Sequence, residues 1–119
     1  MYHQDWLIRQ IRYTIQFIAM LLFKRNTAVY EVRDIDRLTQ TDELYLRMRT
    51  LLGERRINEA ENLLFERLDE ADLDYLRIAL DFYAKVNDLS DAELEAADFS
   101  RDEVESGLDD FKRIYGIFF

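Results

Sequence analysis

The chain has 119 residues, a net charge of −9, no cysteine and no proline. Its length suits a single domain, which buries roughly two-thirds of the surface that its unfolded chain would expose. The lack of cysteine excludes disulfides, thiolate metal sites and a cysteine nucleophile, and suits a reducing compartment. With 25 acidic against 16 basic residues, the overall field repels polyanions, so we expect no nucleic-acid partner.

The most apolar stretch lies near the start of the chain, from Trp6 to Phe23, and it predicts a helix over Gln4–Lys24. Its apolar residues form two stripes. One stripe has the 3-4-3-4 spacing of a coiled-coil seam and consists of Ile8, Ile11, Ile15, Ile18 and Leu22. The other stripe runs along another side of the helix through Trp6, Tyr13, Phe17 and Met20.

A helix that is apolar on two sides must be covered on both. One face can pack on its own domain, and the other then needs a second copy of the chain, another protein or lipid. We expect the protein to form a homodimer through this helix. The residues predicted for the interface are Ile8, Ile11, Ile15, Ile18, Leu22, Trp6 and Phe17.

This helix does not have the features of a membrane span or a secretory signal. The apolar run Thr14–Phe23 is shorter than the about 20 residues that a spanning helix needs. Charged residues interrupt the stretch before it, and Lys24 and Arg25 follow the run rather than precede it. We therefore expect a cytoplasmic protein. A membrane-surface role using Arg9 and Arg12 with these two residues is the weaker alternative.

The rest of the chain predicts an irregular linker followed by short helices, so the whole is an all-α domain of five to six helices. The apolar N-terminal helix takes residues 1–25, the linker residues 26–40 and a helical-hairpin bundle residues 41–119. Within the linker, a helical turn is expected near Asp34–Leu38. The helices after it are expected at Asp42–Glu54, Asn58–Glu70, Leu73–Asn87, Asp91–Ala97 and Arg101–Tyr115.

Capping signals support these helices. The sequences starting at Asn58, Ser90 and Ser100 each have a glutamate three residues later, which is the pattern of a capping box. Thr39 or Thr41 and Asp72 provide single N-terminal caps, and Gly116 provides a C-terminal cap. The apolar tail Ile117–Phe119 is expected to dock on the bundle.

The stretch LLGERRINEAENLLFERL, residues 51–68, resembles a tetratricopeptide hairpin. It has an apolar first helix, a short basic turn, the small Ala60 where the helices cross, and then Leu63 and Leu64. The pattern does not recur at the ~34-residue period of such repeats, since Leu94 stands where a second small residue is needed. A stack of tetratricopeptide-like hairpins is therefore expected rather than a strict repeat array.

The opening MYHQDWLIRQI, together with Leu21, Leu22 and Phe23, is similar to a family of small bacterial proteins of unknown function. Members of that family start with a Tyr-x-x-Asp-aromatic helix and continue into a tetratricopeptide-like bundle. The resemblance covers most of the chain and implies this fold and a bacterial cytoplasmic protein. It implies no catalytic residues.

No catalytic, metal or cofactor site is predicted, and we do not expect an enzyme. His3 is the only histidine, with only Asp5 as a local partner, and it is interpreted as an incidental surface residue. Ser90 and Ser100 are better explained as helix caps than as nucleophiles. The acidic clusters lack the spacing of a calcium-binding loop, and no glycine-rich phosphate loop is present.

Two further groups of residues leave a small-ligand binder open as an alternative. Tyr45, Tyr75 and Tyr83 are candidates to line a groove with nearby carboxylates. The densest basic group, Arg47, Arg49, Arg55 and Arg56, has the chemistry to bind a carboxylate or phosphate. We expect this basic group instead to pair with neighbouring acids such as Glu54 and Glu59.

Overall fold

The computed structural model describes residues 2–118, with side chains from residue 5 onward. This part of the chain forms six helices and no strand, so the predicted all-α fold is confirmed. The helices are α1 (Tyr2–Phe23), α2 (Gln40–Gly53), α3 (Ile57–Arg67), α4 (Leu73–Asn87), α5 (Asp91–Ala96) and α6 (Arg101–Ile114). Their bounds lie close to those predicted from the periodicity, and those of α4 agree to the residue.

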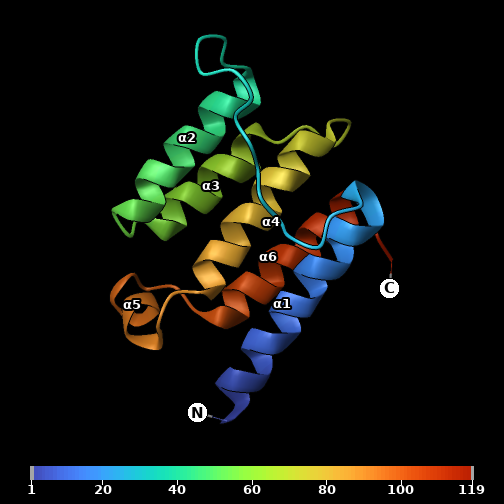
Figure 1. The fold of residues 1–119 in the computed structure, drawn as a ribbon. Helices are drawn as coiled ribbons and strands as arrows, with labels where there is room; N and C mark the ends of the chain where they lie inside the picture. Colours follow the sequence, from blue (N-terminus) through green and yellow to red (C-terminus); the bar gives the residue numbers. More distant parts are fainter. Residues whose placement is uncertain (1, 119) are drawn as a thin grey trace.

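Helix α4 is the centre of the molecule. It contacts α1, α2, α3 and α6, and Figure 1 shows it between the α2–α3 hairpin and the pair formed by α1 and α6. Ten of its fifteen residues are buried, which matches its apolar residues on nearly every side. The N-terminal helix is predicted to be covered on both of its apolar sides, but the helix that is buried on nearly every side within the chain is α4.

Most of the predicted caps are formed. Capping boxes close the N-termini of α2, α5 and α6 at Thr39, Ser90 and Ser100, and the Asp72 carboxylate accepts from the Asp74 backbone N–H at the start of α4. Gly116 has a φ of +68°, as its capping role requires. In the tail, Ile117 docks while Phe118 is 84% exposed, and Phe119 lies outside the described residues.

The predicted capping box at Asn58 is wrong, because distant contacts use its residues. Helix α3 begins one residue earlier, at Ile57, whose side chain is fully buried. The Asn58 side chain donates to the Asp98 carbonyl at 3.1 Å. Glu61, the expected reciprocal residue, accepts from the Tyr83 hydroxyl at 2.6 Å. Burial of Ile57 thus sets where α3 begins, and no side chain caps its N-terminus.

The segment from Lys24 to Thr39, called segment 24–39 below, contains no helix or strand. It crosses the face of α4 from the end of α1 to the start of α2 (Figure 1). Its predicted turn is present, with the Arg37 N–H donating to the Asp34 carbonyl at 3.1 Å. Tyr30 fixes the segment to the bundle, because its side chain is buried and its N–H donates to Asp81 Oδ2 at 2.9 Å.

Candidate functional site

The isoleucine seam of α1 faces the core of its own chain. Ile11, Ile15 and Ile18 are at most 3% exposed, and Ile8 and Leu22 are partly buried. Helix α1 contacts α4 and α6. The prediction that this seam forms an interface is therefore wrong. Seam spacing identifies a helix face that must be covered, but it does not tell whether the same chain covers it.

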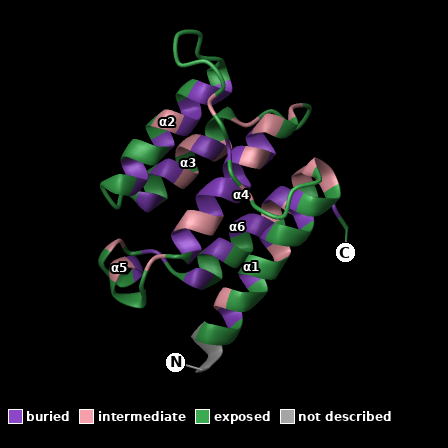
Figure 2. Ribbon diagram, in the orientation of Figure 1, coloured by how far each residue is buried: buried purple, intermediate pink, exposed green. Residues whose placement is uncertain are grey.

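The other side of α1 is exposed and mostly apolar. Trp6, Tyr13, Phe17, Met20 and Leu21 are each between 48% and 60% exposed, and Figure 2 shows exposed residues along this outer side. Gln10 completes the row, in which successive members from Trp6 to Met20 are three or four residues apart, and Leu21 lies beside Met20. We call this set the α1 stripe: Trp6, Gln10, Tyr13, Phe17, Met20 and Leu21. It contains no charged residue and extends for about 22 Å along the helix.

The predicted interface residues thus divide between the two sides of α1. Only Trp6 and Phe17 belong to the α1 stripe, and the structure adds Tyr13, Met20 and Leu21 as exposed apolar side chains beside them. The spacing of the second stripe was visible in the sequence. Its exposure became visible only when α4 and α6 were placed against the first stripe.

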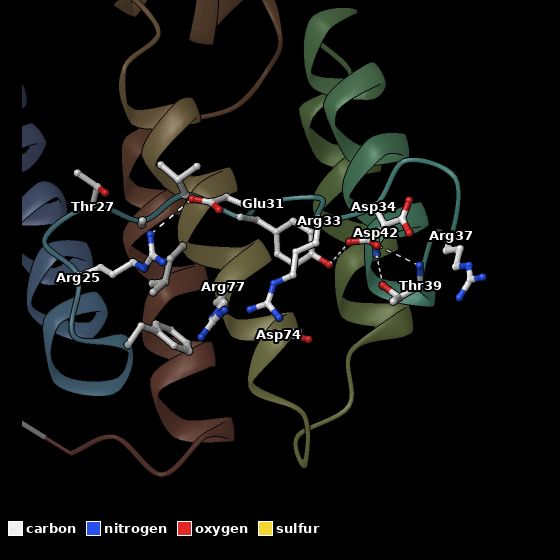
Figure 3. Close-up of a pocket in the computed structure, with 15 residues that line it drawn as sticks. Arg25, Thr27, Glu31, Arg33, Asp34, Arg37, Thr39, Asp42, Asp74 and Arg77 are labelled. Carbon is white, nitrogen blue, oxygen red and sulfur yellow. Dashed lines mark hydrogen bonds and ion pairs between the residues drawn. The ribbon is translucent and has the colours of Figure 1, made fainter.

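A cavity of about 320 Å³ lies where segment 24–39 passes over the end of α1 and the first half of α4 (Figure 3). Four arginines line it: Arg25, Arg33, Arg37 and Arg77. Arg25 lies 3.5 Å from Glu31. Among residues 5–118, no carboxylate comes within ion-pair distance of the other three arginines. We call this space the arginine cavity.

Arg77 is held in an unusual environment within the arginine cavity. Its guanidinium carbon lies 4.4 Å from the centre of the Phe23 ring, close enough for a cation–π contact. Its Nε is buried and has no hydrogen-bond partner. Asp74 lies one turn earlier on α4 and also lines the cavity, yet the two side chains form no ion pair. The aromatic ring therefore positions this guanidinium without neutralising it.

Hydrogen bonds hold another part of the cavity lining, formed by Tyr30, Thr39 and Asp42, in place. The Tyr30 hydroxyl donates to Asp42 Oδ1 at 2.7 Å and lies 2.7 Å from the Thr41 hydroxyl. The Thr39 N–H donates to Asp42 Oδ2 at 3.0 Å. Burial alone would raise the pKa of the Asp42 carboxyl, but the hydrogen bonds from Thr39 and Tyr30 outweigh it and lower that pKa. Burial raises the pKa of the Tyr30 hydroxyl to about 12.

The other predicted polar groups have structural partners. Arg56 pairs with Glu54 and Glu59, as expected, and Arg55 pairs with Glu93. The prediction that Tyr45, Tyr75 and Tyr83 line a groove is wrong, because all three side chains are buried. The hollow beside Tyr45 measures only about 10 Å³, too small for a ligand.

A metal site needs grouped residues of the ligand types, and a membrane span needs a helix of sufficient length and hydropathy. No group of three or more histidine, cysteine, aspartate or glutamate residues there is arranged to hold a metal ion. The His3 side chain lies outside the described side chains, so its interpretation stays a prediction. None of the helices in residues 2–118 combines the length and hydropathy needed to cross a membrane.

The fold and its two unusual surfaces define a small all-α protein with an exposed apolar helix face and an arginine-lined cavity. The chain belongs to DUF6483, a family of unknown function, and the match extends over residues 1–116. The expected membership in a family of unknown function is thereby confirmed. No curated protein and no solved structure gives a significant match to the chain.

Proposed function

We propose that this protein is a non-enzymatic interaction protein that forms a homodimer through the α1 stripe. The observation that carries the proposal is an uncharged, mostly apolar row on an exposed helix face, spaced four, three, four and three residues apart from Trp6 to Met20. This is the spacing with which one helix packs along another. Helix α1 is thus still the proposed interface, but through the face that is turned away from the core and not through the isoleucine seam.

The size of the α1 stripe suits a pair of chains. Half of a large side chain presents about 100 Å², so five such residues present roughly 500 Å² in one copy and about 1,000 Å² in a pair. That total reaches the lower limit of specific interfaces. It also places the stripe among the larger apolar patches that single chains expose.

Charge favours a second copy over lipid as the occupant. Two chains of net charge −9 repel each other over most of their surface. The α1 stripe has no charge of its own, so it can pack on its symmetry-related copy without placing like charges face to face. An anionic membrane would have to be attracted by Arg9, Arg12, Lys24 and Arg25. Two of these, Arg12 and Arg25, already lie within 4 Å of Asp88 and Glu31.

The test compares the mass of the wild-type chain in solution with that of the double variant Tyr13→Glu, Met20→Glu. Sedimentation velocity should give the wild type twice the 14.4 kDa of one chain, and the variant the mass of one chain. Both positions are about half exposed and glutamate is a good helix former, so the variant should keep its helix content and melting temperature.

A matched control adds the same two charges elsewhere on exposed helix positions, as Gln16→Glu with Asn62→Glu. The control should remain a dimer. A wild type that sediments as one chain, or a stripe variant that stays dimeric, would refute the proposal. A monomeric wild type that floats with anionic vesicles would assign the stripe to lipid instead.

A further inference from the structure

The arginine cavity takes no part in the proposed self-association, and its chemistry points to a separate function. We propose that it binds a small organic anion whose carboxylate or phosphate group sits between Arg33 and Arg77. Arg33 comes from segment 24–39 and Arg77 from α4, and both line the cavity (Figure 3). A guanidinium fork matches either oxyanion in a bidentate geometry.

The first argument is the local charge pairing. The acids that line the cavity are mostly engaged elsewhere. Glu31 lies beside Arg25, and Asp34 accepts from the Asp36 N–H. Asp42 accepts from Thr39 and Tyr30, and the charge of Arg33 also helps to lower its pKa. Asp74 lines the cavity as well but forms no ion pair with Arg77. Within residues 5–118, neither Arg33 nor Arg77 has an acid at ion-pair distance. Two cations that converge on one partly enclosed space repel each other unless an anion lies between them.

The second argument is that the Arg77 side chain is already positioned before any ligand binds. Contact with the Phe23 ring restricts where its guanidinium can point, and a positioned side chain loses less conformational freedom when a ligand binds. Arg77 donates no hydrogen bond to any described residue, and its Nε is buried without a partner. The structure thus holds a cation in place while leaving its donors unused, which suits recognition of an external acceptor.

The third argument is the shape and lining of the cavity. A volume of about 320 Å³ lies at the small end of the range of ligand pockets, about 300–1,000 Å³. Phe23, Val29 and Leu80 contribute apolar surface to the lining. This combination fits a short hydrocarbon body that carries one anionic group, rather than a large cofactor.

Two probes test the proposal and separate the two ligand classes: inorganic phosphate and butyrate, each added to the full chain at constant ionic strength. Amide chemical shifts are followed by NMR. At least one probe should give saturable shifts for amides of segment 24–39 and of the first turns of α4. Arg33→Gln and Arg77→Gln should each weaken that binding about tenfold or more.

Arg47→Gln removes an exposed arginine of α2 that does not line the cavity, and it should leave the affinity unchanged. The double variant Tyr13→Glu, Met20→Glu should also bind the probe normally, so failure of self-association does not affect this result. If Arg77→Gln lowers the helix content, Arg33→Gln decides, because it lies on an exposed loop. The proposal is wrong if neither probe gives saturable shifts, or if Arg33→Gln binds as tightly as the wild type.

Discussion

Two carboxylates within the helix bundle, Asp81 and Glu61, each accept a hydrogen bond from a tyrosine, but only Asp81 has a cation beside it. Asp81 is 1% exposed, accepts from the Tyr45 hydroxyl at 3.2 Å and forms an ion pair with Lys85. Glu61 is half-buried and accepts from the Tyr83 hydroxyl at 2.6 Å. No lysine or arginine of residues 5–118 lies within ion-pair distance of it.

The difference shows two ways of holding a charge inside a bundle. Asp81 has its full set of partners, including the Tyr30 N–H, and it thereby holds segment 24–39 over the arginine cavity. Glu61 lacks a compensating charge, so burial raises the pKa of its carboxyl. Burial and the neighbouring Glu61 charge likewise raise the pKa of the Tyr83 hydroxyl. We therefore expect the contribution of Asp81 to stability to depend on its paired charges. The contribution of Glu61 should depend on the space around it and on the pH.

Replacing Asp81 should have the largest effect. Asp81→Ala leaves the Tyr30 N–H, the Tyr45 hydroxyl and the Lys85 ammonium without their acceptor. The Lys85 side chain is 39% exposed and can turn to water, so the cost comes mainly from the two donors of Tyr30 and Tyr45. At about 2 kcal/mol for each buried donor left without an acceptor, the free energy of unfolding should fall by about 4 kcal/mol. Urea denaturation followed by circular dichroism measures the change.

Asp88→Ala, at the residue that follows the last residue of α4, is the matched control. The Asp88 side chain is 71% exposed and lies 3.9 Å from Arg12, so its loss should cost less than about 1 kcal/mol. If Asp81→Ala is no more destabilised than Asp88→Ala, the buried network does not anchor segment 24–39.

The Glu61 site should be sensitive to volume, because Gly107 provides the space for it. A Cβ added at Gly107 would lie 2.1 Å from the Tyr83 hydroxyl oxygen and 2.8 Å from Glu61 Oε2, so the pair must move. Overpacking costs about 1–3 kcal/mol, and alanine returns up to about 1 kcal/mol of helix propensity. The cost of overpacking and the cost of the weakened hydrogen bond together should exceed the gain in helix propensity. Gly107→Ala should therefore lower the free energy of unfolding by about 2 kcal/mol.

Gly53→Ala provides the comparison for this variant. Nothing lies within 4 Å of a Cβ at Gly53, so that substitution should leave stability unchanged or raise it by up to about 1 kcal/mol. Equal melting temperatures for the two alanine variants would show that Tyr83 and Glu61 can shift freely, and that the contact is not confined by Gly107.

Local signals in the sequence predicted the helices but not the contacts between them. The caps at Thr39, Ser90 and Ser100 depend on residues three positions apart, so they could be read from the chain. The start of α3 could not, because it depends on the burial of Ile57 and on the contact of Asn58 with Asp98. The predicted tetratricopeptide-like arrangement stays a prediction.

The candidate sites likewise separate into a local pattern that the sequence shows and distant contacts that it does not show. Periodicity identified both apolar sides of α1, but it assigned the isoleucine seam to an interface, because spacing does not distinguish internal from external packing. The arginine cavity left no local pattern at all. Arg33 lies in an irregular segment and Arg77 lies on a helix far along the chain. Contacts between distant residues, such as the hydrogen bond from the Tyr30 N–H to Asp81, bring their surroundings together.

The smallest expected effect is the pH dependence that distinguishes Glu61 from a well-paired carboxylate. The folded-state pKa of Glu61 is raised above its ordinary value of 4.5, mainly by burial. Folding therefore favours the protonated form. Its contribution to stability is fully present below pH 4.5 and is lost as the pH rises through the raised pKa. The stability of the wild type relative to Glu61→Gln should thus fall between pH 4.5 and neutrality, as measured by urea midpoints.

Glu93 provides a control of opposite sign. Hydrogen bonds from the Ser90 backbone and from Arg55 lower the pKa of the Glu93 carboxyl to about 2. Its contribution is present above the ordinary value and is lost only as the pH falls toward that lowered pKa. The difference between the wild type and Glu93→Gln should therefore stay constant from pH 4.5 to neutrality and shrink below it. Parallel curves for Glu61→Gln and Glu93→Gln would mean that the half-buried carboxylate is compensated as well as the exposed one, which would remove the contrast between Glu61 and Asp81.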